Sequence, residues 1–146
     1  MAQFRFPLDK VLRWRAIELT REESKLQVLI EEKARLEAML ARVAHERSAL
    51  TGSVSSLPAL RGDDLRALAA YGLRLRRHFE KLNEARGRAQ RNLAAQQKKY
   101  AEAKTRVRLL EELKSRRFER WRYEEGRELE SLATESYLTG WNRDEP

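Results

Sequence analysis

The 146-residue chain is long enough for one ordinary domain, yet 37% of its residues are charged and only 8% are aromatic. This composition is more typical of long helices than of a compact core. The absence of cysteine excludes disulfides, thiolate metal sites and cysteine nucleophiles. No segment approaches the roughly 18 apolar residues of a membrane span, and Arg13, Arg15 and Glu18 interrupt any run resembling a signal peptide. We therefore expect a soluble, cytoplasmic protein.

The net charge of +8 is unevenly distributed along the chain. Residues 1–50 carry 10 basic and 8 acidic side chains, residues 61–108 carry 14 and 5, and residues 111–146 carry 7 and 10. Nearly all the excess positive charge therefore lies in the middle third of the sequence.

The first predicted helix covers about residues 7–50. Pro7 suits the first helical position, because its missing N–H is not needed there, and Asp9 then lies in the first turn, where it favours the helix dipole. Alternating steps of four and three residues from Leu8 to Leu50 reach an apolar side chain at nine of 13 positions. This spacing is typical of the apolar stripe of a coiled coil.

Four charged residues occupy positions within this apolar stripe, namely Arg15, Glu22, Lys33 and Arg47. Their long side chains can reach solvent from the edge of a two-helix interface. Alternatively, polar residues in the interface can set the register of the two helices. Both interpretations are compatible with the sequence.

A turn is predicted over residues 51–63, because Thr51–Pro58 is uncharged and poor in helix-forming residues. Gly62, Asp63 and Asp64 then predict the start of a second helix, with an aspartate as N-cap. This helix covers about residues 64–138, and its apolar stripe runs from Leu65 to Leu110. Beyond Leu110 the same steps reach Lys114, Arg117 and Trp121, which predicts a shifted stripe or a segment that lacks a partner helix.

Two stripes of similar length on either side of a turn predict an all-α fold. Residues 1–146 would form a single domain in which two long helices make an antiparallel coiled-coil hairpin. Leu50 would lie near Leu65, and Leu8 near Val107. Roughly the last 25 to 30 residues of the second helix would then project beyond the first.

No catalytic, cofactor or metal site is predicted. The two histidines, His45 and His78, lie far apart in the predicted hairpin and are surrounded by charge. The chain contains no phosphate-binding loop, dinucleotide fingerprint or nucleophile elbow. Adjacent glutamates such as Glu111 and Glu112 have basic partners at helical spacing, which is typical of a solvated helix face. We therefore expect a protein without enzymatic activity.

A run of basic residues on the second helix is the strongest electrostatic feature. It fits an acidic partner, whether nucleic acid, anionic lipid or an acidic protein surface, and it equally fits an ordinary solvated face. A basic coiled coil that binds nucleic acid is thus one alternative function, although base stacking has little support because Tyr71, Phe79 and Tyr100 lie on or beside the apolar stripe. The run comprises Arg74, Arg76, Arg77, Lys81, Arg86, Arg88, Arg91, Lys98 and Lys99.

Aromatic residues gather near both ends of the chain, which the hairpin brings together. We expect Phe4 and Phe6 to pack against Leu109 and Leu113 at the start of the first helix. Trp121 and Trp141 would remain exposed on the projecting part of the second helix and would mark a protein interface. The full set is Phe4, Phe6, Phe118, Trp121, Tyr123, Tyr137 and Trp141, with Trp14 off the first stripe.

Two motifs resemble those of the flagellar export protein FliJ family. The first is Phe4-Arg5-Phe6-Pro7-Leu8, followed by Val11-Leu12, Arg15 and Glu18. The second is Leu110-Glu111-Glu112-Leu113-Lys114-Ser115-Arg116-Arg117, followed by Trp121-Arg122. The resemblance covers nearly the whole chain. It implies an antiparallel two-helix coiled coil, similar to the central stalk subunit of rotary ATPases, that serves flagellar type III protein export without catalysis.

The resemblance also implies partners and a location. The protein would be cytoplasmic, peripheral to the inner membrane at the flagellar base, and would bind no specific nucleic acid. The end with both termini would insert into the export ATPase hexamer and promote its assembly and activity, through Phe4, Phe6, Leu8, Val11, Leu12, Leu110, Leu113, Arg117, Phe118 and Trp121. The half near the turn would contact the export gate membrane protein through Leu40, Val43, Tyr71, Leu75, His78 and Leu82. A second alternative is an export chaperone that holds unfolded flagellar substrates.

Overall fold

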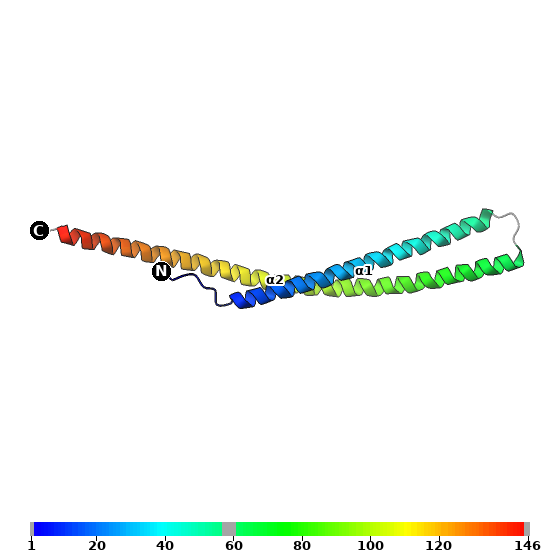
Figure 1. The fold of residues 1–146 in the computed structure, drawn as a ribbon, viewed down its shortest axis with the longest axis horizontal. Coiled ribbons are helices and arrows are strands. Elements are labelled where there is room, and N and C mark those ends of the chain that lie inside the picture. The colour runs from blue at the N-terminus through cyan, green and yellow to red at the C-terminus, as the bar shows by residue number, and fades with distance from the viewer. Residues whose placement is uncertain (1, 57–60, 145–146) are drawn as a thin grey trace. The chain divides into compact units, whose positions relative to one another are not determined.

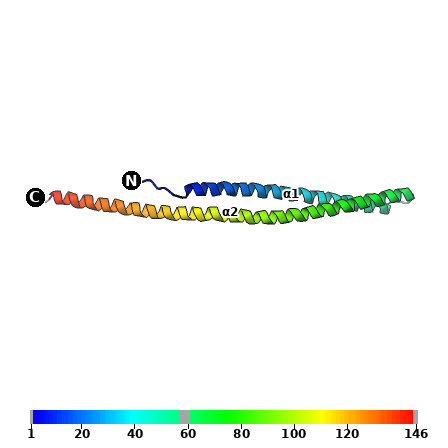
Figure 2. The same ribbon diagram turned by 90° about the horizontal axis from the view of Figure 1, so that it is seen from below.

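The computed structural model describes residues 2–56 and 61–144, which form two helices and no strand. Helix α1 spans Asp9–Ser56 and helix α2 spans Gly62–Asp144 (Figure 1). The chain divides into two compact units: unit 1 comprises Met1–Leu19 with Glu102–Pro146, and unit 2 comprises Thr20–Ala101. Within each unit, a stretch of α1 packs antiparallel to a stretch of α2, which confirms the predicted all-α hairpin of two long helices (Figures 1 and 2).

Helix α1 begins at Asp9 rather than at Pro7. Pro7 lies in a tight turn in which the N–H of Asp9 donates to the carbonyl of Phe6 at 3.1 Å, and the N–H of Leu12 donates to the carbonyl of Leu8 at 2.9 Å. The fixed φ of proline therefore serves the turn before the helix instead of the first helical position. Asp9 lies in the first turn as predicted, where its charge favours the helix dipole.

Helix α1 also extends to Ser56, whereas the sequence predicts an end near Leu50. The hydroxyl groups of Thr51 and Ser55 donate to the carbonyls of Arg47 and Thr51 at 3.0 and 3.1 Å. These bonds satisfy polar side chains inside a helix, so a segment rich in serine and threonine need not leave it.

Helix α2 begins at Gly62, with Asp63 and Asp64 in its first turn and not at the N-cap. The carbonyl of Arg61 accepts the N–H of Leu65 at 3.1 Å. The helix continues to Asp144, beyond the predicted end at about residue 138. The predicted turn over 51–63 is therefore too long, and its residues 57–60 lie outside the described part of the chain.

The predicted apolar stripes form the core of unit 2. Leu40 and Val43 of α1 and Leu75 and Leu82 of α2 are buried together, with Leu36, Leu50 and Phe79 packed around them. Full burial of such a side chain is worth about 1.5–3 kcal/mol. Contact along these stripes is thus the main source of stability that holds α1 against α2 in this unit.

The register differs from the predicted one by about one heptad. Leu50 packs against Gly72, where an added Cβ would lie 3.6 Å from the Leu50 side chain, whereas the sequence predicts Leu65 opposite Leu50. In unit 1, Lys114 Nζ lies 3.0 Å from Asp9 Oδ1, whereas Leu8 is predicted to lie near Val107. The shift keeps stripe positions facing one another, and it accompanies the extension of α1 beyond Leu50.

One charged stripe residue, Glu22, bonds across the helix interface in unit 2. The buried Gln96 side chain donates to the Glu22 carbonyl at 3.1 Å and also to the Glu22 carboxylate. The bond from Gln96, with Lys25 nearby, lowers the pKa of Glu22 below its ordinary value. A polar pair between facing stripes fits the interpretation that these residues set the register.

Of the other three charged stripe residues, two pair within α1 and one lies over a ring of α2. Arg15 and Lys33 pair with glutamates of their own helix, with N–O distances of 2.9 and 3.8 Å. The Arg47 guanidinium lies 5.4 Å from the centre of the Phe79 ring and is exposed. These side chains fit the interpretation in which long stems reach solvent from the edge of the interface.

Replacing Leu75 with alanine is expected to lower the free energy of unfolding by about 2–3 kcal/mol, because it leaves a cavity in the core of unit 2. Leu73→Ala is the matched control: Leu73 lies on the same helix but is 48% exposed, so its effect should stay within about 0.5 kcal/mol. Urea unfolding followed by circular dichroism measures both. Equal losses in the two variants would contradict the assignment of the core.

Candidate functional site

The candidate site lies in unit 1, where the non-helical residues before α1 run beside α2 (Figures 1 and 2). The turn between Phe6 and Asp9 lets the chain continue along α2 past the start of α1. Phe4 thereby reaches Phe118 and Trp121. We call Phe4, Phe6, Phe118 and Trp121 the terminal aromatic cluster.

Three rings of the terminal aromatic cluster are in mutual contact. The Phe4 and Phe118 centroids are 5.2 Å apart at 78°, an edge-to-face arrangement. Phe118 and Trp121 stack at 5.8 Å and 30°, and Phe4 and Trp121 lie 5.8 Å apart at 49°. Each such pair adds about 0.5–1.5 kcal/mol beyond burial of its area. Ring contacts therefore fasten the N-terminal segment to α2.

Phe6 is the buried member of the cluster, with 8% of its surface exposed. The Arg117 guanidinium carbon lies 5.7 Å from the Phe6 ring centre, a cation–π geometry. Phe4 contacts residues farther along α2 than the predicted Leu109 and Leu113, and Leu109 is 56% exposed, whereas Leu113 is half-buried. The contacts on α2 are thus displaced toward its C-terminus, the same direction as the one-heptad shift in register.

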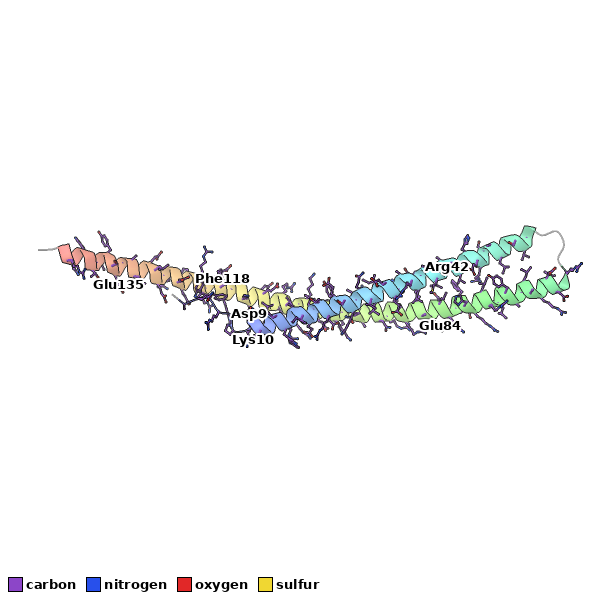
Figure 3. The ribbon with its side chains drawn as sticks, viewed as in Figure 1. Asp9, Lys10, Arg42, Glu84, Phe118 and Glu135 are labelled. Carbon is purple, nitrogen blue, oxygen red and sulfur yellow. The ribbon has the colours of Figure 1, made fainter. Side chains whose placement is uncertain are left out.

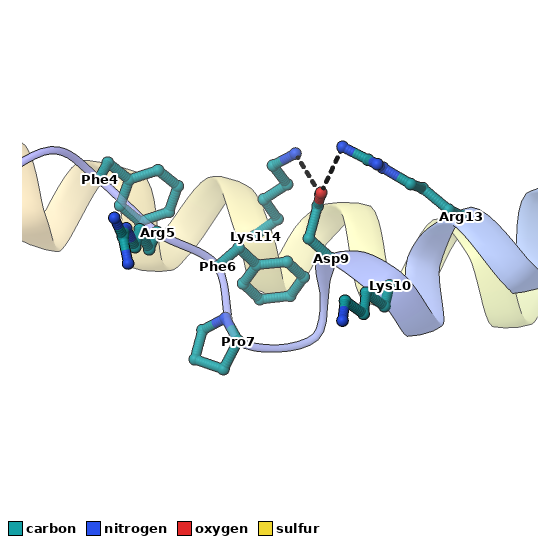
Figure 4. Close-up of a pocket in the computed structure, with 8 residues that line it drawn as sticks. All are labelled: Phe4, Arg5, Phe6, Pro7, Asp9, Lys10, Arg13 and Lys114. Carbon is teal, nitrogen blue, oxygen red and sulfur yellow. Dashed lines mark hydrogen bonds and ion pairs between the residues drawn. The ribbon is translucent and has the colours of Figure 1, made fainter.

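An ion-pair network lies next to the terminal aromatic cluster (Figure 4). Lys114 of α2 and Arg13 of α1 both reach the Asp9 carboxylate, with N–O distances of 3.0 and 3.1 Å. The hydrogen bond from Lys114 is the largest cause of the lowered pKa of Asp9, and the charges of Lys114 and Arg13 add to it. The network joins the first turn of α1 to α2 beside the turn that positions Phe6.

A shallow groove runs beside the cluster, between the N-terminal segment, α1 and α2. Its walls combine two rings and one leucine with three polar or charged residues, a composition suited to a partner side chain with an apolar body and a polar end. It is lined by Phe4, Leu12, Glu111, Lys114, Ser115 and Phe118.

The ten residues predicted to contact the ATPase ring all belong to unit 1, but they fall into two groups. Trp121, predicted to be exposed, is half-buried beneath the N-terminal segment. The buried and half-buried group stabilises unit 1 itself, and the exposed group is available to a partner. The first group comprises Phe4, Phe6, Leu8, Leu12, Leu110, Leu113 and Trp121, and the second Val11, Arg117 and Phe118.

Helix α2 continues well beyond the terminal aromatic cluster. Every residue from Gly126 to Arg143 is exposed, and we call this stretch the free helical segment; Glu135 lies within it in Figure 3. Tyr137 and Trp141, one turn apart, are 73% and 64% exposed, which confirms the predicted exposure of Trp141. A lone helix gains no packing from a second one, so such apolar side chains are available for a partner.

The six residues predicted to contact the export gate all lie in unit 2, and most of them are in its core. Leu40, Val43, Leu75 and Leu82 are buried between α1 and α2. Tyr71 and His78 are exposed, and the Arg74 guanidinium lies 5.9 Å from the centre of the Tyr71 ring. Only these two side chains of the set offer surface to a partner.

Within residues 2–56 and 61–144, no group of three or more acidic or histidine side chains could hold a metal ion. Neither helix, over the same ranges, has a stretch apolar enough to cross a lipid bilayer. The chemistry that the described site offers is ring surface, aliphatic surface and ion pairs, which are the ingredients of protein recognition.

Sequence reasoning missed the Asp9–Lys114 and Glu22–Gln96 contacts. A signal for both exists in the stripes, because Lys114 and Gln96 are polar residues at stripe positions of the second helix. A polar stripe residue requires a polar partner across the interface, and acidic residues lie near the facing positions once the register is shifted by one heptad.

Comparison with known proteins gives no match to this chain among protein-family models, curated proteins or solved structures.

Replacing Phe4 with alanine is expected to expose Trp121, because two of the three ring contacts in the cluster involve Phe4. In a Trp14→Phe, Trp141→Phe background, the emission of the remaining Trp121 should shift to longer wavelength and become more accessible to acrylamide. Arg5→Ala is the control, since Arg5 is exposed and adjacent in sequence. An unchanged Trp121 spectrum in the Phe4 variant would refute the described cluster.

Replacing Lys114 with methionine is expected to raise the pKa of Asp9 toward its ordinary value, because it removes the largest cause of the lowered value. A carboxyl group with a lowered pKa in the folded state stabilises the fold fully above its ordinary pKa of about 3.9. That contribution is lost as the pH falls through the lowered value.

Nuclear magnetic resonance titration of the Asp9 carboxyl carbon measures this pKa directly. Lys10→Met is the matched control, because Lys10 adjoins Asp9 in sequence and forms no ion pair with it among the described residues. If the Asp9 titration were the same in wild type and both variants, the Lys114 contact would be absent in solution.

Proposed function

We propose that this protein is a non-enzymatic stalk component of a flagellar type III protein export apparatus. Its unit 1 inserts into the ring of the export ATPase and promotes assembly and hydrolysis. Unit 2 contacts the membrane-embedded export gate. The protein is then cytoplasmic and peripheral to the inner membrane at the flagellar base.

The observation that carries this proposal is the free helical segment at the end that also holds the Phe4–Leu8 motif. Tyr137 and Trp141 project from a helix with no partner among the described residues, and exposed aromatic side chains are common anchors of protein interfaces. A single exposed helix of this kind fits the central opening of a ring better than it fits a flat surface, because a ring can contact the helix on all sides.

The burial pattern gives the motif residues a specific role in this proposal. Phe4, Phe6 and Trp121 hold the N-terminal segment on α2, so they shape the inserted end instead of touching the ring with their whole surface. Val11, Arg117 and Phe118, with the exposed aromatics of the free helical segment, provide the direct contacts.

The gate contact in this proposal rests on Tyr71 and His78. Both are exposed on α2 of unit 2, at the edge of the apolar stripe and about one helical turn from the buried Leu75 and Leu82. The core residues then act by holding α2 in place and thereby presenting Tyr71 and His78.

The exposed aromatic residues of the free helical segment also favour a second candidate, an export chaperone for flagellar substrates. Such a protein would bind unfolded substrates without the ATPase, through Tyr137 and Trp141. Pull-down of a late substrate by the isolated protein separates the two functions, because the stalk function requires no such binding.

The Tyr137→Ala, Trp141→Ala double variant is expected to weaken apparent affinity for the export ATPase of the same organism about tenfold or more. The readout is the concentration dependence of ATPase stimulation. Trp14→Ala is the matched control, since Trp14 is similarly exposed in unit 1 but lies on α1, and its stimulation curve should stay within about twofold. Unchanged stimulation by the double variant would remove the basis of the ring-insertion proposal.

A further inference from the structure

The excess positive charge of this protein belongs to unit 2. Residues 20–101 carry 17 basic and 10 acidic side chains, a net charge of +7, whereas unit 1 carries 14 and 13. Within unit 2, α2 supplies most of the difference, with 10 basic and 4 acidic side chains over residues 62–101, and Arg61 precedes it. Unit 2 therefore has a polar surface that the proposed ring contact of unit 1 does not use.

Most of the basic side chains that α2 contributes to unit 2 are aligned on one face. Six of them follow steps of three, four or seven residues, the same spacing as the apolar stripe but on the opposite side of the helix from Leu75 and Leu82. All six are exposed. We call this set the basic stripe; it consists of Arg74, Arg77, Lys81, Arg88, Arg91 and Lys98.

The positive charge of the basic stripe is largely uncompensated. Among the described residues, no ion pair involves any of its six members; Arg74 instead lies over the Tyr71 ring. Two acidic residues lie on the same face: Glu80 pairs with Arg76 at 3.7 Å, and Glu84 projects from α2 between Lys81 and Arg88 (Figure 3). The stripe thus keeps a net charge of about +4 or more over its length.

The basic stripe is long and linear. From Arg74 to Lys98 it covers 24 residue steps of a helix without proline, which is about 36 Å at 1.5 Å per residue. Its exposed neighbours on this face include the small residues Ala94 and Ala95. A straight row of this kind can place all six cationic side chains against a flat surface simultaneously.

We propose that the basic stripe lies along an anionic lipid bilayer and attaches unit 2 to the membrane surface without insertion. Each Lys or Arg near an anionic bilayer contributes about 1 kcal/mol, so a row of six gives firm but reversible binding that salt weakens. The inference does not depend on the ATPase contact, since it concerns a different unit and a different surface.

Other acidic partners fit this surface less well. A protein interface usually has aromatic anchors and few lysines in its centre, whereas the basic stripe contains no aromatic residue between Arg77 and Lys98 other than the core-facing Phe79. The major groove of duplex DNA, about 12 Å wide, admits a helix but curves away from a straight row of 36 Å. A plane is the partner that engages all six cations together.

The test measures co-sedimentation of the full-length protein with large vesicles of phosphatidylcholine containing 30% phosphatidylglycerol, and with vesicles of phosphatidylcholine alone. Binding is expected only to the anionic vesicles at about 0.1 M salt, with loss at about 0.5 M. The triple variant Arg77→Gln, Arg88→Gln, Arg91→Gln should lower the partition coefficient about 10- to 100-fold. Glutamine keeps helix propensity, and circular dichroism checks the fold.

The matched control is Arg21→Gln, Arg35→Gln, Arg42→Gln, which removes the same charge from exposed positions of α1 in unit 2. It should lower the partition coefficient about threefold at most. Equal losses of partition coefficient in the two triple variants would show that binding depends on net charge alone, and this result would overturn the proposal. So would the absence of binding to anionic vesicles at about 0.1 M salt. Preferential binding of a 30-base-pair duplex through the same three arginines would assign the stripe to nucleic acid instead.

Discussion

Burial of a single apolar stripe on each helix is the constraint on which the rest of this structure depends. A helix in a two-helix packing hides only the side chains that face its neighbour, so the other faces stay in water whatever their composition. Leu40, Val43, Leu75 and Leu82 occupy the hidden side in unit 2. Every residue that acts on a partner must therefore lie on one of the remaining faces or beyond the end of the stripe.

Near the start of α1, other residues replace the helix as the packing partner of α2. Past Lys114, which pairs with Asp9 in the first turn of α1, α2 has no further α1 helix against which to pack, and its next stripe positions are Arg117 and Trp121. The non-helical residues before α1 take the place of the helix there: Phe6 lies beside Arg117, and Phe4 contacts Trp121. The change from leucines to polar and aromatic residues thus matches a change in the partner, from a helix to a short non-helical segment.

The sequence predicts which residues are buried better than it predicts which residues meet. The period of 3.5 residues identifies Leu75 and Leu82 as interface residues, because periodicity depends on each helix alone. The register depends on both helices, and stripes that repeat every seven residues are almost equivalent after a shift of one heptad, so Leu65 and Gly72 are both reasonable neighbours of Leu50. The neighbours of Phe4 could not be predicted at all, because the residues before Asp9 have no periodicity and follow a turn. Helix α1 continues past its predicted end near Leu50 because the hydroxyl groups of Thr51 and Ser55 bond to carbonyls of their own helix.

The same constraint changes how a contact motif should be interpreted in a two-helix protein. Leu75 and Tyr71 lie one turn apart on α2, yet the leucine packs into the core and the tyrosine faces solvent beside Arg74. Replacing Leu75 would loosen the packing of α1 on α2 and so displace Tyr71 and His78 together. A binding assay alone would then show weaker binding, as if Leu75 itself contacted the partner. Substituting Tyr71 leaves the core intact. A partner that binds this part of α2 can therefore be identified only through exposed positions, and the burial of each residue decides which variants carry that information.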